Sequence, residues 1–137
     1  MFVGVSIKQR YGGHAMQTGH VASQCQIGAY TGTCIIVVDN DIDVSNVDER
    51  LWALCTRSDL ASSIDIIKTA WLTPLDPRIP REKRERGDFT NSRANIDAGR
   101  PFHWRHKFQK VNMPGKAVQR ETRERFGWIL DNWRKGE

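Results

Sequence analysis

The stretch IIVVDNDIDVSN, residues 35–46, decides the fold that we expect of this chain. Its first four residues are apolar, as expected of a central strand in a sheet that is covered on both faces. Three acidic residues follow at a spacing of two: Asp39, Asp41 and Asp43. Ser45 or Asn46 can then cap a helix, because its side chain accepts hydrogen bonds from the free N–H groups of a first turn. The stretch therefore predicts a buried strand that turns directly into a helix.

Strand and helix patterns alternate on both sides of this stretch. Residues 3–7 alternate as a strand, residues 14–28 carry small side chains at helical spacing, and residues 63–68 form a third strand. The helix after Asn46 should pack through one face, made of Val47, Leu51, Leu54 and Cys55. This order predicts an α/β fold: a small parallel or mixed sheet built from β-α-β-α-β, with helices on its faces. Right-handed crossovers would pair the strands in parallel.

The C-terminal part of the chain has a different composition and a less regular pattern. The loop WLTPLDPRIP, residues 71–80, contains three prolines, and the polar segment after it shows no clear period. We expect an α/β core over residues 1–77, an extended basic arm over 78–116 and an amphipathic helix over 117–137. The apolar face expected of that helix consists of Val118, Thr122, Phe126, Ile129, Leu130 and Trp133.

Charge is unevenly distributed along the 137 residues. Residues 1–77 carry five Lys and Arg against eight Asp and Glu, whereas residues 78–137 carry sixteen against eight. A basic half that contains Phe102, Trp104 and Phe108 can bind nucleic acid. However, acidic residues are interleaved with the basic ones and would weaken a groove that tracks phosphates. A basic α/β nucleic-acid-binding module, or a purely oligomerising one, is therefore the alternative.

The expected compartment and the redox state of the cysteines rest on three sequence features. No apolar run approaches the ~20 residues that span a bilayer, and residues 1–10 do not resemble a signal peptide. Cys25, Cys34 and Cys55 form no C-x-x-C pair. We expect a cytoplasmic protein with reduced thiols and no membrane contact.

The aspartates allow three interpretations. Asp-x-Asp-x-Asp begins like a calcium loop, but Val44 stands where such a loop needs glycine and Arg50 where it needs a bidentate glutamate. Two carboxylates at the carboxyl end of a parallel strand could instead perform acid–base chemistry. The structural interpretation is that Asp43 and Ser45 bond free N–H groups at the turn. The Gly12-Gly13 pair and the four histidines give no stronger signal for a binding or metal site.

Four stretches together resemble the C-terminal domain of the UbiD family of decarboxylases. They are SIKQRYGGHA, IIVVDNDIDVSNVDERLWALCTR, WLTPLDP and RGDFTNSRANIDAGRPFHW, and the similarity runs from about Val3 to Trp104. The D-x-D-I-D, L-W-A-L-x-T-R and P-L-D-P pieces occur in the family's order. The chain looks closer to members that act on aromatic acids than to the ubiquinone-pathway enzyme.

The resemblance implies a C-terminal domain or subunit of a non-oxidative decarboxylase or carboxylase that acts on an aromatic or unsaturated carboxylic acid. Such enzymes use prenylated FMN with a divalent metal (Mn or Mg) and potassium. A separate flavin-binding domain holds these groups and supplies a Glu-Arg-Glu catalytic set, which nothing in this chain matches. No catalytic residue, cofactor or metal is therefore expected on this chain alone. The implied partners are that flavin-binding domain and further copies in a homo-oligomer.

In the family, this domain closes over the active site, and its P-L-x-P loop approaches the substrate. Carried over residue by residue, Thr73, Pro74 and Leu75 would face the substrate cleft. The same loop would follow a parallel strand, where α/β proteins commonly bind ligands. Alternatively, the prolines merely turn the chain. The aspartates then correspond to the family's strand-to-helix turn and form no metal site.

Overall fold

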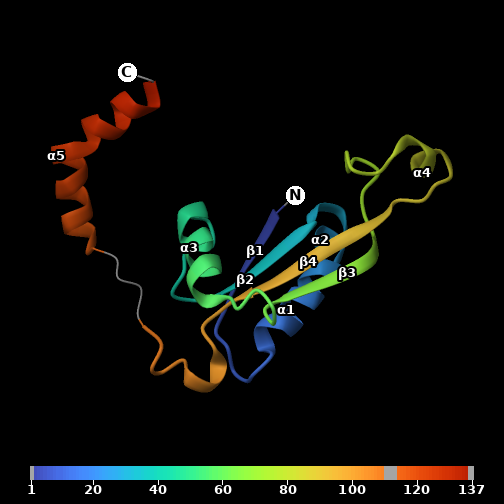
Figure 1. The fold of residues 1–137 in the computed structure, drawn as a ribbon, viewed down its shortest axis with the longest axis horizontal. Helices are drawn as coiled ribbons and strands as arrows, with labels where there is room; N and C mark the ends of the chain where they lie inside the picture. Colours follow the sequence, from blue (N-terminus) through green and yellow to red (C-terminus); the bar gives the residue numbers. More distant parts are fainter. Residues whose placement is uncertain (1, 110–113, 136–137) are drawn as a thin grey trace.

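A computed structural model describes residues 2–109 and 114–135 (Figure 1). These described residues form four strands, five helices and one 3-10 turn, η1. In order they are β1 (Phe2–Ile7), α1 (His14–Gln24), α2 (Gln26–Thr31), β2 (Cys34–Asp39), α3 (Val47–Arg57), β3 (Ile64–Trp71), α4 (Arg81–Glu85), β4 (Thr90–Ala98), η1 (Phe102–Trp104) and α5 (Lys116–Lys135).

The four strands form one mixed sheet in the order β1-β2-β4-β3. β1, β2 and β4 are parallel, with Val5 opposite Val37 and Val37 opposite Asp97. The parallel pairing predicted for β1 and β2 is confirmed. It is wrong for β3, which lies at the sheet edge and runs antiparallel to β4. The segment after α3 lies at the carboxyl end of β4, where Ser58 Oγ donates to the Asp97 carbonyl oxygen at 2.8 Å, so β3 starts at that edge and runs back along β4.

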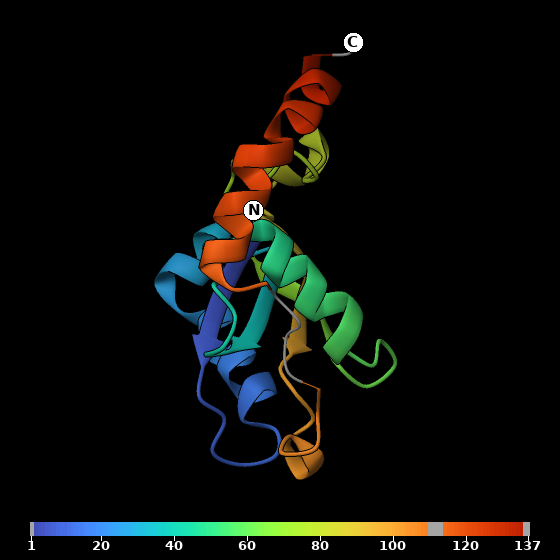
Figure 2. The ribbon, with the colours of Figure 1, turned by 90° about the vertical axis from the view of Figure 1, so that its left-hand side faces the viewer.

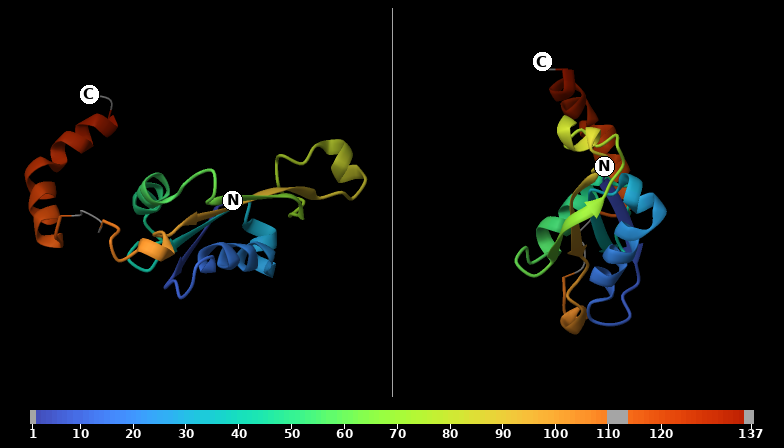
Figure 3. Two further views of the ribbon diagram at one scale, coloured as in Figure 1. Left: turned by 60° about the horizontal axis from the view of Figure 1, so that its bottom comes forward. Right: turned by 90° about the vertical axis from the view of Figure 1, so that its right-hand side faces the viewer.

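Helices cover both faces of the sheet, as predicted (Figures 2 and 3). Side chains of β2 alternate between the two layers. Ile35 and Val37 pack with Ala15 under α1, whereas Ile36 and Val38 belong to the cluster that includes Ala53 of α3. β2 is therefore buried on both faces, which explains why its sequence is apolar without alternation.

The helix predicted over residues 14–28 is interrupted. Gly13 begins α1 with a positive φ of 88°, and the chain then becomes extended at Cys25 before α2 starts. A Cβ atom on Gly28 would lie 1.7 Å from the Ala22 carbonyl oxygen. Any residue with a side chain at position 28 would therefore prevent α2 from approaching α1 this closely. Gly28 thus permits the close packing of α2 against the end of α1 beyond the break at Cys25.

Of the four residues in the packing face predicted for α3, only Leu54 packs against the core, so most of that prediction is wrong. Val47 and Leu51 are exposed, whereas Ala53 and Arg57 are buried. The small Ala53 lets the helix approach β2, and Arg57 turns inward toward carboxylates that follow β2. The predicted cap is correct, since the Asn46 side chain accepts from two backbone N–H groups of the first turn.

The segment predicted as an irregular basic arm, residues 78–116, contains β4 in the middle of the sheet. Residues 110–113 of this segment lie outside the described part. The C-terminal helix is confirmed as α5, which stands apart from the sheet (Figure 1). Val118, Phe126 and Ile129 are about half exposed. The side chains of Leu130 and Trp133 and residues 136–137 lie outside the description.

Candidate functional site

Two carboxylates at the end of β2 pair with two arginines that come from distant segments. The Arg57 guanidinium donates to both oxygens of Asp41, at 3.0 and 2.8 Å. Arg100, just after β4, donates its backbone N–H and Nε to Asp39 Oδ2 at 2.8 and 3.0 Å. Asp39 and the Arg57 side chain are almost fully buried. This network joins β2, α3 and β4 at the carboxyl edge of the parallel strands.

Neighbouring groups set the charge of this network. Gln9, after β1, donates to Asp39 Oδ1 at 2.9 Å and to the Arg100 carbonyl oxygen at 2.9 Å. Burial raises the pKa of Asp41, but hydrogen bonds from Arg57 and the charges of Arg57 and Arg100 outweigh it and hold that pKa below its usual value. Burial, with a smaller contribution from the Asp39 charge, raises the pKa of Asp97. The Asp41 carboxylate is therefore a stable anion that compensates Arg57.

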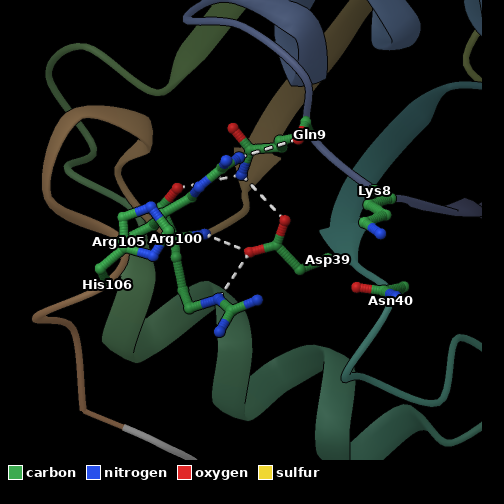
Figure 4. Close-up of a pocket in the computed structure, with 7 residues that line it drawn as sticks. All are labelled: Lys8, Gln9, Asp39, Asn40, Arg100, Arg105 and His106. Carbon is green, nitrogen blue, oxygen red and sulfur yellow. Dashed lines mark hydrogen bonds and ion pairs between the residues drawn. The ribbon is translucent and has the colours of Figure 1, made fainter.

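A polar cavity of about 240 Å³ opens beside Asp39 (Figure 4). Lys8 and Asn40 lie on one side of Asp39, and Arg100, Arg105 and His106 lie on the other. Its lining residues are Lys8, Gln9, Asp39, Asn40, Arg100, Arg105 and His106. They come from the segments after β1, β2, β4 and η1, so the parallel strands bring them together. An α/β sheet commonly binds ligands at this edge.

The structure supports the structural interpretation of the third aspartate. Asp43 Oδ1 accepts from the backbone N–H and the hydroxyl of Ser45, at 2.9 and 2.6 Å. Among the described residues, no three His, Cys, Asp or Glu side chains are grouped as metal ligands. Asp39 and Asp41 instead face arginines, which occupy the oxygens that a cation would need.

The loop that contains Thr73, Pro74 and Leu75 lies at the opposite edge of the sheet. Because β3 is antiparallel, its last residue, Trp71, pairs with Thr90 at the start of β4. The loop and α4 project beyond this end of the sheet (Figure 1). The expectation that the loop follows a parallel strand is therefore wrong, and the case for a cleft here rests on the resemblance and on the loop itself.

Hydrogen bonds from inside the loop and from β4 define its shape. The Asp76 carboxylate is buried and accepts from Arg78 N at 3.0 Å and Asn91 Nδ2 at 3.2 Å. Arg84 of α4 donates to the carbonyl oxygens of Asp76 and Ile79, at 2.6 and 3.0 Å. Burial raises the pKa of Asp76, but the bonds from Arg78 and Asn91 outweigh it and lower that pKa overall. Contacts within this chain thus hold the loop in its conformation.

Leu75 is the prominent side chain of this loop. It is 85% exposed, although Leu72 on the same loop is almost completely buried. A cavity of about 290 Å³ lies beside it, lined on one side by Tyr30 and Thr31 of α2 and on the other by Thr73 of the loop. An exposed leucine on a fixed loop beside a partly apolar cavity is suited to contact an apolar group from outside the chain.

Arg93 joins the two walls of this cavity. Its side chain, 2% exposed, donates to the carbonyl oxygens of Ser23, Gly28 and Ala29 around the α1–α2 break, and to that of Trp71 at the end of β3. All four of these acceptors are neutral backbone carbonyl groups. Burial lowers the pKa of the guanidinium. Arg93 therefore fixes α2 relative to the start of the P-L-D-P loop.

The two cavities beside the sheet are too small and have the wrong ligands for a flavin nucleotide with its metal. Their volumes, about 240 and 290 Å³, fall below the ~300–1,000 Å³ of typical cofactor pockets. The described residues also lack a three-residue metal-ligand group. Neither of these two cavities therefore fits the implied prenylated FMN with its metal.

Sequence reasoning missed the basic cavity, although a signal was present. Ala94, Ile96 and Ala98 alternate with polar residues, which is the period of a strand. Recognising β4 would have placed Arg100 beside Asp39. Of the histidines, His106 lines the cavity, while His20 Nε2 lies 2.8 Å from Asp65 Oδ2 and links α1 to β3. All three cysteines are free.

These features define a single α/β domain with polar groups at one edge of its sheet and a rigid apolar loop at the other. The chain belongs to the family described as the 3-octaprenyl-4-hydroxybenzoate carboxy-lyase C-terminal domain (UbiD_C), whose model matches residues 2–98. The match includes β4 and the P-L-D-P loop. It confirms the resemblance seen in the sequence.

Several similar proteins are decarboxylases, and they are much longer than this chain. A phenolic acid decarboxylase from Bacillus subtilis (strain 168) is 38% identical over 73 residues, which is 53% of this chain and 15% of that protein. The UbiD-class enzyme HmfF from Pelotomaculum thermopropionicum, solved with FMN, superposes with a TM-score of 0.68 at 25% identity, over 84% of this chain and 24% of that one.

A second solved enzyme is known in two conformations. Vanillic acid decarboxylase from Sedimentibacter hydroxybenzoicus in open form superposes with a TM-score of 0.68 at 26% identity, over 96% of this chain and 27% of that one. Its closed form gives 0.67 at 26%, over 93% and 26%. The chain thus spans about a seventh of the matched curated relatives' length and about a quarter of these structures.

Proposed function

We propose that this chain is the C-terminal domain or subunit of a UbiD-like non-oxidative decarboxylase that acts on an aromatic or unsaturated carboxylic acid. The family match over residues 2–98 carries the proposal. The decarboxylase relatives support the reaction class, and the FMN complex of HmfF supports a flavin cofactor in the whole enzyme. We also propose the prenylated form of FMN, with Mn or Mg and potassium, on the flavin-binding domain.

The role of this chain in the reaction is to complete and close the substrate cleft. Thr73, Pro74 and Leu75 would form one wall, with Leu75 in contact with the apolar part of the acid. The Asp76 and Arg84 bonds hold the loop in place before substrate arrives, so little ordering free energy is lost on closure. Closure would exclude water and position the acid. The open and closed forms of the vanillic acid enzyme support such a movement.

Assembly and compartment belong to the same proposal. Val118, Phe126 and Ile129 of α5 are exposed, and an apolar helix face of this kind favours contact with another copy. We propose a homo-oligomer that works in the cytoplasm with its thiols reduced. Within residues 2–109 and 114–135, none of the helices combines the length and the apolar character that crossing a bilayer requires.

A chimaeric enzyme tests this proposal. The chain would replace the matching C-terminal segment of the Bacillus subtilis phenolic acid decarboxylase, and release of CO₂ from a phenolic acid would be measured. We expect activity in the chimaera and none in the same enzyme truncated before that segment. A chimaera that folds and retains its flavin, yet releases no CO₂, would count against the proposed role.

A further inference from the structure

We propose that the polar cavity at the carboxyl edge of the parallel strands binds a small oxyanion, a carboxylate or a phosphate, through Lys8, Asn40 and Arg105. This site lies at the opposite end of the sheet from the P-L-D-P loop. It does not depend on the proposed decarboxylase function, and it takes a different ligand from the apolar contact expected of Leu75.

The charges around the cavity leave an excess of positive charge. Arg100 is paired with Asp39 at 3.0 Å, and the Asp41 carboxylate behind them is paired with Arg57 at 2.8 Å. In the described part of the chain, Lys8 and Arg105 have no carboxylate within 4.0 Å, although both line the cavity. Two uncompensated cations on one cavity attract an anion.

One of the free donors, Arg105, is held in place before any ligand arrives. The Arg105 guanidinium donates through Nη1 to the Gln9 carbonyl oxygen at 2.8 Å and lies 4.4 Å from the centre of the Phe102 ring. These contacts fix the plane of the guanidinium. A guanidinium can donate two parallel hydrogen bonds to two oxygens of a carboxylate or phosphate. Asn40 follows β2 directly and supplies an amide on the far side of Asp39 (Figure 4).

Asp39 lines the cavity but does not oppose an anion strongly. Its Oδ1 accepts from Gln9, and its Oδ2 accepts twice from Arg100, so three donors already satisfy its charge. Removing Asp39 would release Gln9 and Arg100. Asp39 therefore has a structural role, because it holds these two lining residues in position.

The size of the cavity selects the class of ligand. About 240 Å³ holds roughly eight water molecules at ~30 Å³ each, which is enough for a phosphate or a small carboxylic acid. It is below the ~300–1,000 Å³ of pockets that enclose cofactors or drug-sized molecules. The cavity therefore fits a small oxyanion and is too small to enclose a whole nucleotide.

A titration of the ¹⁵N-labelled full chain tests the proposal. Sodium phosphate and sodium acetate would be added separately at constant ionic strength, and backbone amide shifts recorded. We expect saturable shifts at residues 8–10, 40 and 105–106. Lys8→Ala and Arg105→Gln should each weaken the affinity by about tenfold, because each removes one charged donor. Lys68→Ala is the matched control, since it removes one exposed lysine on β3 and should change nothing.

The pattern of saturation distinguishes the sources of the anion. Saturation by phosphate alone identifies a phosphate site, whereas saturation by acetate identifies a site for the carboxylate of a small acid or of an acidic side chain. Shifts that stay linear for both anions, or an equal loss in Lys68→Ala, would overturn the proposal. Lys8 is exposed, so Lys8→Ala should fold even if Arg105→Gln does not. In that case the affinity of Lys8→Ala alone tests the proposal. The measurement needs no catalytic domain, so its failure and that of the proposed function are distinguishable.

Discussion

Replacing Arg93 by methionine should lower the free energy of unfolding by about 3 kcal/mol. Arg93 donates to four backbone carbonyl groups on α1, α2 and β3, and a bond from a charged donor contributes ~1.5–3 kcal/mol. The variant recovers the several kcal/mol that desolvation of a buried guanidinium costs. One carbonyl group, that of Gly28, also keeps a bond from Gly32 N. The free energy of the lost hydrogen bonds, less the recovered desolvation cost, leaves a net loss of about 3 kcal/mol.

Urea denaturation followed by tryptophan fluorescence measures this loss, and the melting temperature should fall by roughly 12 °C at ~4 °C per kcal/mol. Arg93→Lys separates charge from geometry: one ammonium group cannot reach carbonyls on three elements, so this variant should lose nearly as much stability. Arg10→Met is the matched control, because Arg10 is exposed, and it should stay within ~0.5 kcal/mol of the parent. A change below 1 kcal/mol in Arg93→Met would refute the assigned role of this arginine.

Three further predictions concern the carboxylates and the basic half of the chain. Asp41→Asn should cost about 2–3 kcal/mol at pH 7, because the buried Arg57 loses its bidentate partner. The folded-state pKa of Asp41 is lowered, so its contribution to stability is present above about pH 4 and is lost progressively as the pH falls further. The difference between parent and variant in urea melts should therefore shrink with falling pH, and a constant difference would contradict this. Calorimetric titration with calcium should show no site of micromolar affinity, since arginines already bind Asp39 and Asp41, and a one-to-one isotherm lost in Asp41→Ala would show the opposite. Single-stranded DNA, followed by fluorescence anisotropy, should bind weakly and be released by about 0.15 M salt, whereas sub-micromolar binding at that salt would favour the nucleic-acid alternative.

The sequence predicted those elements whose burial follows a simple period. β2 is apolar on both faces and lies in the centre of the sheet, and the Asn46 cap begins α3 as expected. β4 was missed because Arg93 and Asn95, both almost fully buried, sit in the middle of the strand. Arg93 is tolerated there because backbone carbonyls solvate its charge, and those carbonyls become available only when the helix breaks at Cys25. Local sequence does not reveal such a distant compensation.

The candidate sites show the same limit. The resemblance drew attention to Thr73, Pro74 and Leu75, but the sequence could not show that β3 reverses and carries them to the amino edge of the parallel strands. The basic cavity combines residues from four segments separated by up to 98 positions, from Lys8 to His106. Their proximity depends on the strand order, which follows only from the complete sheet.

The catalytic efficiency of the assembled enzyme with Leu75→Ala tests the central claim most directly. Leu75 is 85% exposed on this chain, so its removal should not disturb the domain, and flavin content should stay nearly unchanged. Loss of one apolar contact with substrate should lower kcat/KM by roughly 10–100-fold or shift the preference among acids. Leu51→Ala, an exposed leucine on α3, is the matched control and should behave like the parent. If Leu75→Ala also matches the parent for every accepted acid, the P-L-D-P loop is only a turn and this domain does not shape the cleft as proposed.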